Sequence, residues 1–141
     1  YQSKLDEGAW KVIDKNVTNA ISEVAVIAAA KLDAKAIVVP TKTGSAVRMI
    51  SSFRPACTII ASTLDETMQR QLNLSWGIHP ILNKFIGDQK EFFENVIKEA
   101  VATDLICEGD HIILAAGIPA GHKGSTNMIK MHVVGEEVIG N

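Results

Sequence analysis

Hydrophobic residues along the chain follow two alternating patterns. Helical periods of three to four residues occupy the segments 18–32, 45–53, 65–72 and 92–105. Short apolar runs, typical of buried strands, occupy the segments 36–40, 57–61, 77–82 and 110–115. A last segment, 127–134, alternates with a period of two, which indicates a strand with two different faces. The pattern therefore predicts helices and strands that follow one another in turn.

Strands that alternate with helices are typical of an α/β domain whose strands run mainly parallel. We predict a single three-layer α/β domain, with a mainly parallel five-stranded sheet flanked by helices. Strand 77–82 contains Pro80, so it should be short or lie at an edge of the sheet. The last strand follows a loop of about ten residues, so we expect it to pair antiparallel with the strand before it. We expect an extension or linker over 1–16, the domain over 17–134 and a tail or linker over 135–141.

The most informative segment joins the first strand to the second helix. It contains Thr41, Lys42, Thr43, Gly44 and Ser45. Two threonine hydroxyls, a serine hydroxyl and an ammonium group there meet the positive end of the helix dipole. A phosphate or carboxylate fits such a loop. The alternative is structural, with Thr43 or Ser45 as a helix cap and Gly44 as a turn residue.

A second loop, over 117–127, contains three glycines, a histidine and a lysine between two strands. It is longer and more basic than a plain hairpin needs. It is not a nucleotide-hydrolysing P-loop, because Lys123 precedes Gly124 and a strand follows where a helix should.

Composition narrows the classes of function. The 141 residues suit one domain with its own core, and 47% of them are hydrophobic. A net charge of −2 argues against broad binding to nucleic acid or to a membrane surface. Histidines and cysteines show no metal-ligand spacing, so we expect no metal site. Cys57 and Cys107 lie in or beside apolar runs, which favours buried, reduced thiols and a cytoplasmic protein.

Several motifs, in the same order, resemble the C-terminal domain of pyruvate kinase. Residues 41–48 (TKTGSAVR) resemble T-x-[ST]-G-x-[ST]-A-R, and residues 51–55 (SSFRP) resemble S-x-[YF]-R-P. Residues 59–63, 70–80, 109–119 and 124–127 are similar to P-I-I-A-x-T, R-x-L-x-L-x-W-G-V-x-P, G-D-x-[IV]-[IV]-x-x-x-G-x-P and G-x-T-N. The departures are Val47, where the family often has alanine, and Cys57-Thr58 before the second strand. The resemblance covers about residues 17 to 134.

The resemblance implies a regulatory domain of a cytoplasmic, tetrameric glycolytic enzyme that transfers phosphate from phosphoenolpyruvate to ADP. In that family Mg²⁺ and K⁺ belong to a separate catalytic barrel, so this domain would hold no cofactor, have no catalytic residues and be inactive alone.

By the same resemblance, residues 41–45 would bind the phosphate of an allosteric effector, such as fructose 1,6-bisphosphate, another sugar phosphate or AMP. Pro119, His122, Lys123 and Gly124 would belong to a flap that folds over the effector. The domain would also contribute to self-association in the tetramer. Because the chain begins without methionine, we interpret it as part of a longer protein.

Two other functions stay open at this point. The first is a stand-alone module of the same fold that binds a phosphorylated ligand and is not part of a kinase. The second is a free-standing enzyme that uses Lys42 or His122 as an acid or base in the same pocket. The two loops contain no carboxylate, which disfavours the enzyme.

Overall fold

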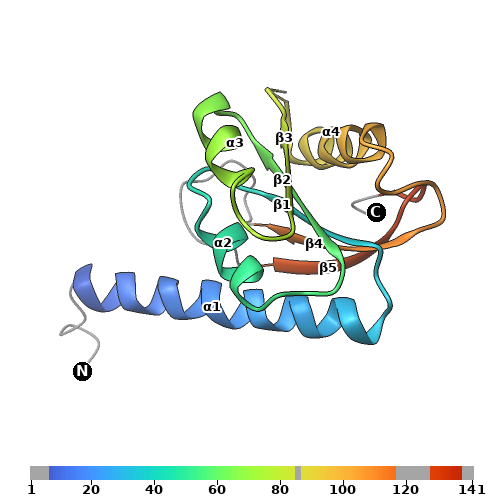
Figure 1. The fold of residues 1–141 in the computed structure, drawn as a ribbon. Coiled ribbons are helices and arrows are strands. Elements are labelled where there is room, and N and C mark those ends of the chain that lie inside the picture. Colours follow the sequence, from blue (N-terminus) through green and yellow to red (C-terminus); the bar gives the residue numbers. More distant parts are fainter. Residues whose placement is uncertain (1–6, 85–86, 117–127, 138–141) are drawn as a thin grey trace.

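The computed structural model describes residues 7–84, 87–116 and 128–137, of which residues 7–16 are described by their backbone alone. Within these residues, strands and helices alternate along the chain (Figure 1). Their bounds are α1 Glu7–Lys31, β1 Ala36–Pro40, α2 Ser45–Ser52, β2 Thr58–Thr63, α3 Glu66–Leu72, β3 Ile78–Leu82, α4 Gln89–Ala102, β4 His111–Ala116 and β5 Met128–Val133.

The five strands form one sheet in the order β3-β2-β1-β4-β5 (Figure 1). Strands β1, β2, β3 and β4 run parallel to one another, and β5 pairs antiparallel with β4. The predicted α/β class, the mainly parallel sheet and the antiparallel last strand are therefore confirmed. The strand that contains Pro80 is indeed an edge strand. An edge position tolerates proline, because one side of the strand makes no ladder hydrogen bonds.

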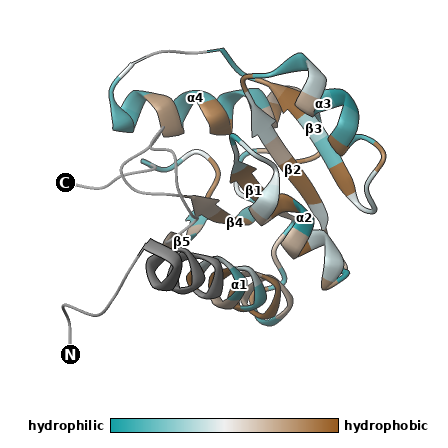
Figure 2. Ribbon diagram, turned by 90° about the vertical axis from the view of Figure 1, so that its left-hand side faces the viewer, coloured by the Kyte–Doolittle hydropathy of each residue, from teal (hydrophilic) through white to brown (hydrophobic). Residues whose placement is uncertain are grey.

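Each face of the sheet has its own hydrophobic core. Three helices, α1, α2 and α3, cover one face, where Ala25, Val47 and Leu72 pack on alternate residues of the strands. Helix α4 covers the other face with Phe93, Val96, Ile97 and Ala100. Strand β1, in the middle of the sheet, contributes residues to both cores and is almost entirely buried. Figure 2 shows the hydrophobic colouring of the central strands between the helix layers.

Helix α1 begins at Glu7 instead of near Thr18, so the predicted start of this helix is wrong. Asn16 and Thr18 are residue types that favour helix caps, but they lie inside the helix. Neither glycine nor proline occurs between Ala9 and Val17, so nothing in that stretch ends the helix. The helix therefore runs through most of the segment that we interpreted as an extension.

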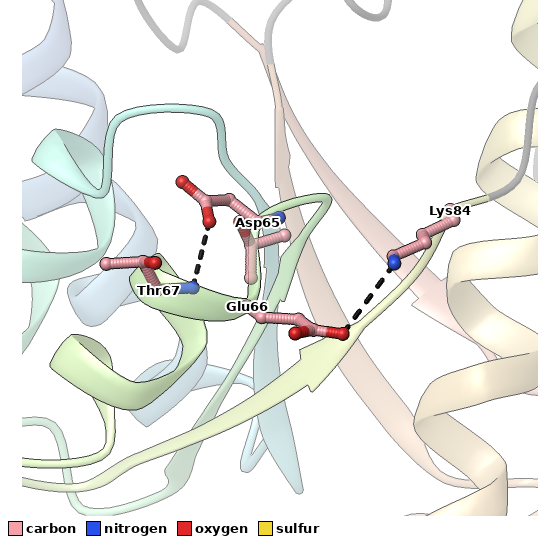
Figure 3. Close-up of polar contacts among 5 residues, drawn as sticks. Asp65, Glu66, Thr67 and Lys84 are labelled. Carbon is pink, nitrogen blue, oxygen red and sulfur yellow. Dashed lines mark hydrogen bonds and ion pairs between the residues drawn. The ribbon is translucent and has the colours of Figure 1, made fainter.

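Aspartate side chains cap both α3 and α4. The carboxylate of Asp65 caps α3 by accepting a hydrogen bond of 2.8 Å from the amide of Thr67 (Figure 3). Helix α4 begins at Gln89, three residues before the predicted Phe92, because Asp88 accepts a bond of 2.8 Å from the amide of Glu91. An ion pair of 3.7 Å between Glu66 and Lys84 links the start of α3 to the residues after β3 (Figure 3).

The two cysteines are free, but only one of them is partly buried. Burial raises the pKa of the half-buried Cys57. Cys107 is exposed, so the prediction of two buried thiols is wrong for this residue. A hydrogen bond of 3.4 Å to the carboxylate of Asp110 raises the pKa of the Cys107 thiol and keeps it protonated.

A pair of buried serines gives a first testable prediction. Both side chains are at most 7% exposed, but Ser51 donates a bond of 2.6 Å to the carbonyl of Trp76, whereas the hydroxyl of Ser22 has no partner among the residues that the structure describes. We expect Ser51→Ala to lower the free energy of unfolding by about 1–2 kcal/mol, because it leaves a carbonyl unpaired. Ser22→Ala removes an unpaired hydroxyl, so we expect no loss and a gain of up to about 1 kcal/mol. Urea unfolding of both variants measures this difference, and equal losses would contradict the assignment of the two hydroxyls.

Candidate functional site

The segment between β1 and α2 is fixed at both ends by hydrogen bonds. The amide of Thr41 donates to the carbonyl of Ser62 at 2.8 Å, which extends the pairing of β1 with β2 by one residue. The hydroxyl of Thr41 accepts a bond of 2.8 Å from the amide of Gly44 and closes the loop. Thr41 is half-buried and Gly44 is buried, whereas Lys42, Thr43 and Ser45 are exposed. The loop is therefore a fixed turn with three exposed polar side chains.

Gly44 precedes the first residue of α2 and has a φ of 81°, a left-handed conformation that glycine adopts without strain. A Cβ at this position would lie 2.9 Å from the sulfur of Met68 and 3.0 Å from Nη1 of Arg48. The turn thus needs glycine both for its backbone conformation and for space.

The N-cap of α2 is Gly44, so the alternative in which Thr43 or Ser45 occupies the cap position is wrong. Thr43, one residue before the cap, accepts a weak bond of 3.3 Å from the amide of Ser45, the first residue of the helix, and donates at 3.2 Å to the hydroxyl of Ser45. Both hydroxyls lie on the surface of the loop, where a ligand would reach them.

The electrostatic setting of the loop favours an anion. The first-turn amides of α2 point toward the loop, as at every helix start, and the first turn contains no acidic residue. Lys42 and Arg48 are both exposed and bring two positive charges to the loop and the first turn of the helix. This setting is suited to a phosphate or carboxylate group.

Arg48 was not among the predicted site residues. Its Nη1 donates a bond of 3.2 Å to the carbonyl of Thr43, and its Nη2 lies 3.8 Å from the sulfur of Met68 in α3. The sequence offered one signal for it, since Arg48 follows Gly44 by one helical turn. Met68 lies in α3, which is distant from the loop along the chain. Only the tertiary structure shows that Met68 lies close to Arg48.

This loop lies at the point where the strand order of the sheet reverses. Strands β2 and β3 continue on one side of β1, whereas β4 lies on the other side. Open α/β sheets bind ligands where the strand order reverses in this way, at the carboxyl ends of the strands. Residues 41–44 follow β1, which is paired with β4.

The structure thus brings together Thr41, Lys42, Thr43, Gly44 and Ser45 in one turn. The other predicted site residues, Pro119, His122, Lys123 and Gly124, lie outside the described residues. Over the described ranges, no cluster of three or more histidine, cysteine or carboxylate side chains could hold a metal ion. Among the helices of the same ranges, none combines the length and apolar character that a membrane span requires.

Comparisons with known proteins agree with this fold. A family model described as "Pyruvate kinase, alpha/beta domain" matches residues 19–132. A pyruvate kinase of Staphylococcus haemolyticus is 40% identical over 135 residues, which are 96% of this chain and 23% of the relative. A pyruvate kinase of Sporosarcina psychrophila is 38% identical over 121 residues, which are 86% of this chain and 21% of the relative. The chain therefore spans between a fifth and a quarter of the length of these relatives.

A solved structure gives the same result. The crystal structure of a pyruvate kinase from Cryptosporidium parvum superposes with a TM-score of 0.72 at 31% sequence identity. The match covers 83% of this chain and 22% of that one. Sequence and structure agree, and the chain belongs to the family of the pyruvate kinase alpha/beta domain.

Proposed function

We propose that this chain is the regulatory C-terminal domain of a cytoplasmic pyruvate kinase and that its loop over 41–45 binds a phosphorylated effector. The observation that supports the proposal most is the combination of an open turn at the switch point of the sheet with a first helical turn free of acidic residues. The whole enzyme would transfer phosphate from phosphoenolpyruvate to ADP in glycolysis. That chemistry, with Mg²⁺ and K⁺, would belong to another part of the parent protein.

Phosphate suits the loop better than a carboxylate does. Three exposed polar side chains, Lys42, Thr43 and Ser45, surround the turn and offer an ammonium and two hydroxyls. Backbone amides at the start of α2 add further donors. A phosphate group has three oxygens that accept such bonds, and charge-assisted bonds are about twice as strong as neutral ones. We infer a sugar phosphate or AMP as the effector, with the phosphate in the turn and the rest of the ligand near the 117–127 loop.

A panel of phosphorylated metabolites tests the proposed function. Binding to the folded chain alone raises its melting temperature, and at one hundred times Kd the stabilisation is about 2.7 kcal/mol. We expect a saturable rise with fructose 1,6-bisphosphate, another sugar phosphate or AMP, and none with the unphosphorylated sugar or nucleoside. If no phosphorylated compound shifts the melting temperature, effector binding by this domain is wrong.

We also propose that α1 and β5 form a surface for self-association in the parent enzyme. Val17, Val24 and Ile27 share one exposed face of α1, and Val24 is 50% exposed. Met131 on the neighbouring β5 is 43% exposed, and α1 lies along this edge of the sheet (Figure 1). Apolar side chains gathered on one surface are typical of a protein interface.

A charge placed in this surface should prevent association. We expect the wild-type chain to form dimers at high concentration and Val24→Glu to remain monomeric, because a carboxylate in the interface would lose its water. Leu74→Glu is the matched control, since Leu74 is 89% exposed in the connection between α3 and β3. Light scattering after size exclusion measures the mass. Dimers that persist in Val24→Glu, or a wild-type chain that stays monomeric, would contradict the proposed surface.

A further inference from the structure

A histidine is buried in the outermost strand of the sheet. His132 lies in β5, which pairs with β4 alone among the described strands, and its side chain is 2% exposed. The directly opposite residue on β4 is Ile112, a member of the core under α4. Nε2 of His132 is buried and has no hydrogen-bond partner within residues 7–84, 87–116 and 128–137. The alternation of β5 predicted two faces, but it did not indicate that this polar residue, instead of Met131, would be the buried one.

The surroundings of the ring disfavour a positive charge. Burial lowers the pKa of His132 most, the neighbouring Lys130 lowers it further, and Glu136 in the following turn opposes both effects. The other charged groups on the elements around this core are Lys90, Glu91, Glu94, Lys98 and Glu99 of α4, and Asp104, Glu108 and Asp110 of the connection to β4. A second proton on the ring would place both a charge and an unpaired donor in an apolar core.

We propose that His132 is an acid-sensitive latch that holds β5 in the sheet. The neutral ring is buried on the face of the sheet to which Ile112 also points, whereas a protonated ring must leave the core for water. Two backbone bonds of 2.9 Å, from Val134 to Asp110 and from Gly109 to Val134, anchor the end of β5, so the strand has to loosen when the ring moves out.

The regulatory consequence rests on the proposed function. Strand β5 carries Met131 of the self-association surface. Acid that loosens β5 would therefore weaken self-association. The stability of the strand itself can be measured whether or not the domain self-associates.

The sign of the effect follows from the direction of the shift. The unfolded chain takes up a proton on His132 near pH 6.5, whereas the folded chain does so only at lower pH. The contribution of His132 to stability is therefore complete above pH 6.5 and falls as the pH decreases below it. If only the unfolded chain is protonated, the unfolding equilibrium constant rises about tenfold between about pH 7.5 and about pH 5.5.

Urea unfolding at these two pH values tests the latch. We expect His132→Gln, which cannot titrate, to lack this tenfold part of the pH dependence. The matched control is His79→Gln, because His79 is exposed on β3 at the other edge of the sheet and should leave the full dependence in place. The proposal is overturned if His132→Gln and the wild-type chain lose stability equally.

A second measurement decides the question should His132→Gln fail to fold. NMR of the folded wild-type chain follows the ring protons of His132, assigned through the backbone, as the pH is lowered. We expect the ring to remain neutral until β5 amides begin to exchange faster. A ring that becomes protonated above pH 6 while β5 stays ordered would overturn the latch.

Discussion

Replacing Lys42 with glutamate should abolish the stabilisation that a phosphorylated effector gives to this chain. The ammonium group is exposed in the turn, so the fold itself does not depend on it. The substitution removes a charge-assisted bond and places a carboxylate beside the phosphate. Charge-assisted bonds contribute about 1.5–3 kcal/mol each, and the added repulsion should bring the total loss to about 3 kcal/mol. Thermal unfolding with increasing effector concentration measures the loss.

The matched control reverses a charge at the other end of the same strand. Lys35 precedes β1 and Lys42 follows it, and both are exposed. Lys35→Glu changes the net charge of the chain by the same amount, so a general electrostatic effect would appear in both variants. We expect Lys35→Glu to keep the full effector response. A Lys42→Glu chain that still gains stability from the effector would show that the phosphate binds elsewhere.

Replacing Gly44 with alanine should both destabilise the chain and weaken phosphate binding. A left-handed conformation costs an alanine about 1–2 kcal/mol, and the new methyl group would contact Met68 and Arg48 at 3.0 Å or less. Arg48 donates to the carbonyl of Thr43, so a shift of its guanidinium would move the turn. We expect a loss of about 2–3 kcal/mol in the free energy of unfolding and a weaker effector response.

Gly77 provides the control for the backbone alone. Its φ is 70°, close to that of Gly44, but a Cβ there would meet no atom of the described residues within 4 Å. Gly77→Ala should therefore lose only the part due to backbone strain and keep its effector response. Equal losses in the two variants, with unchanged binding in both, would contradict the close packing of the turn.

Periodicity was sufficient to predict the class of the fold and the type of each element. The apolar run over 36–40 has only one stable position, in the middle of a sheet covered on both faces, because nearly all of its side chains need burial. Pro80 in turn restricted its strand to an edge. These features depend on single residues or short runs, so they could be predicted from the sequence.

The ends of the helices could not be predicted as well from hydrophobic periodicity. Asp88 and Glu91 have the spacing of a capping box and lie about one turn before the apolar period of α4 begins. A prediction based on hydrophobicity alone therefore places the start of this helix too late. In α1, Trp10, Ile13 and Val17 continue the helical spacing before Thr18, so the start of the helix could not be placed from residue types that favour caps. Helix ends depend on a few hydrogen bonds, and several residues usually compete for the role of cap.

The site could be predicted where it lies in one continuous segment and not where it depends on packing. The five residues of the turn follow directly from the end of β1. Arg48 and Met68 reach the turn only because α2 and α3 lie on the same face of the sheet. Which residue of the loop takes the N-cap position is also decided by the left-handed conformation of Gly44, which the sequence does not specify.

The most direct test of phosphate binding is a backbone NMR titration of the chain, first with inorganic phosphate and then with fructose 1,6-bisphosphate. Amide shifts report which residues meet the ligand without any assumption about the site. We predict saturable shifts that are largest at Thr43, Gly44 and Ser45, in the turn that precedes α2 and at its first residue. Saturable shifts confined to other parts of the chain, or none at any of these three amides, would contradict the assignment of the turn as the effector site.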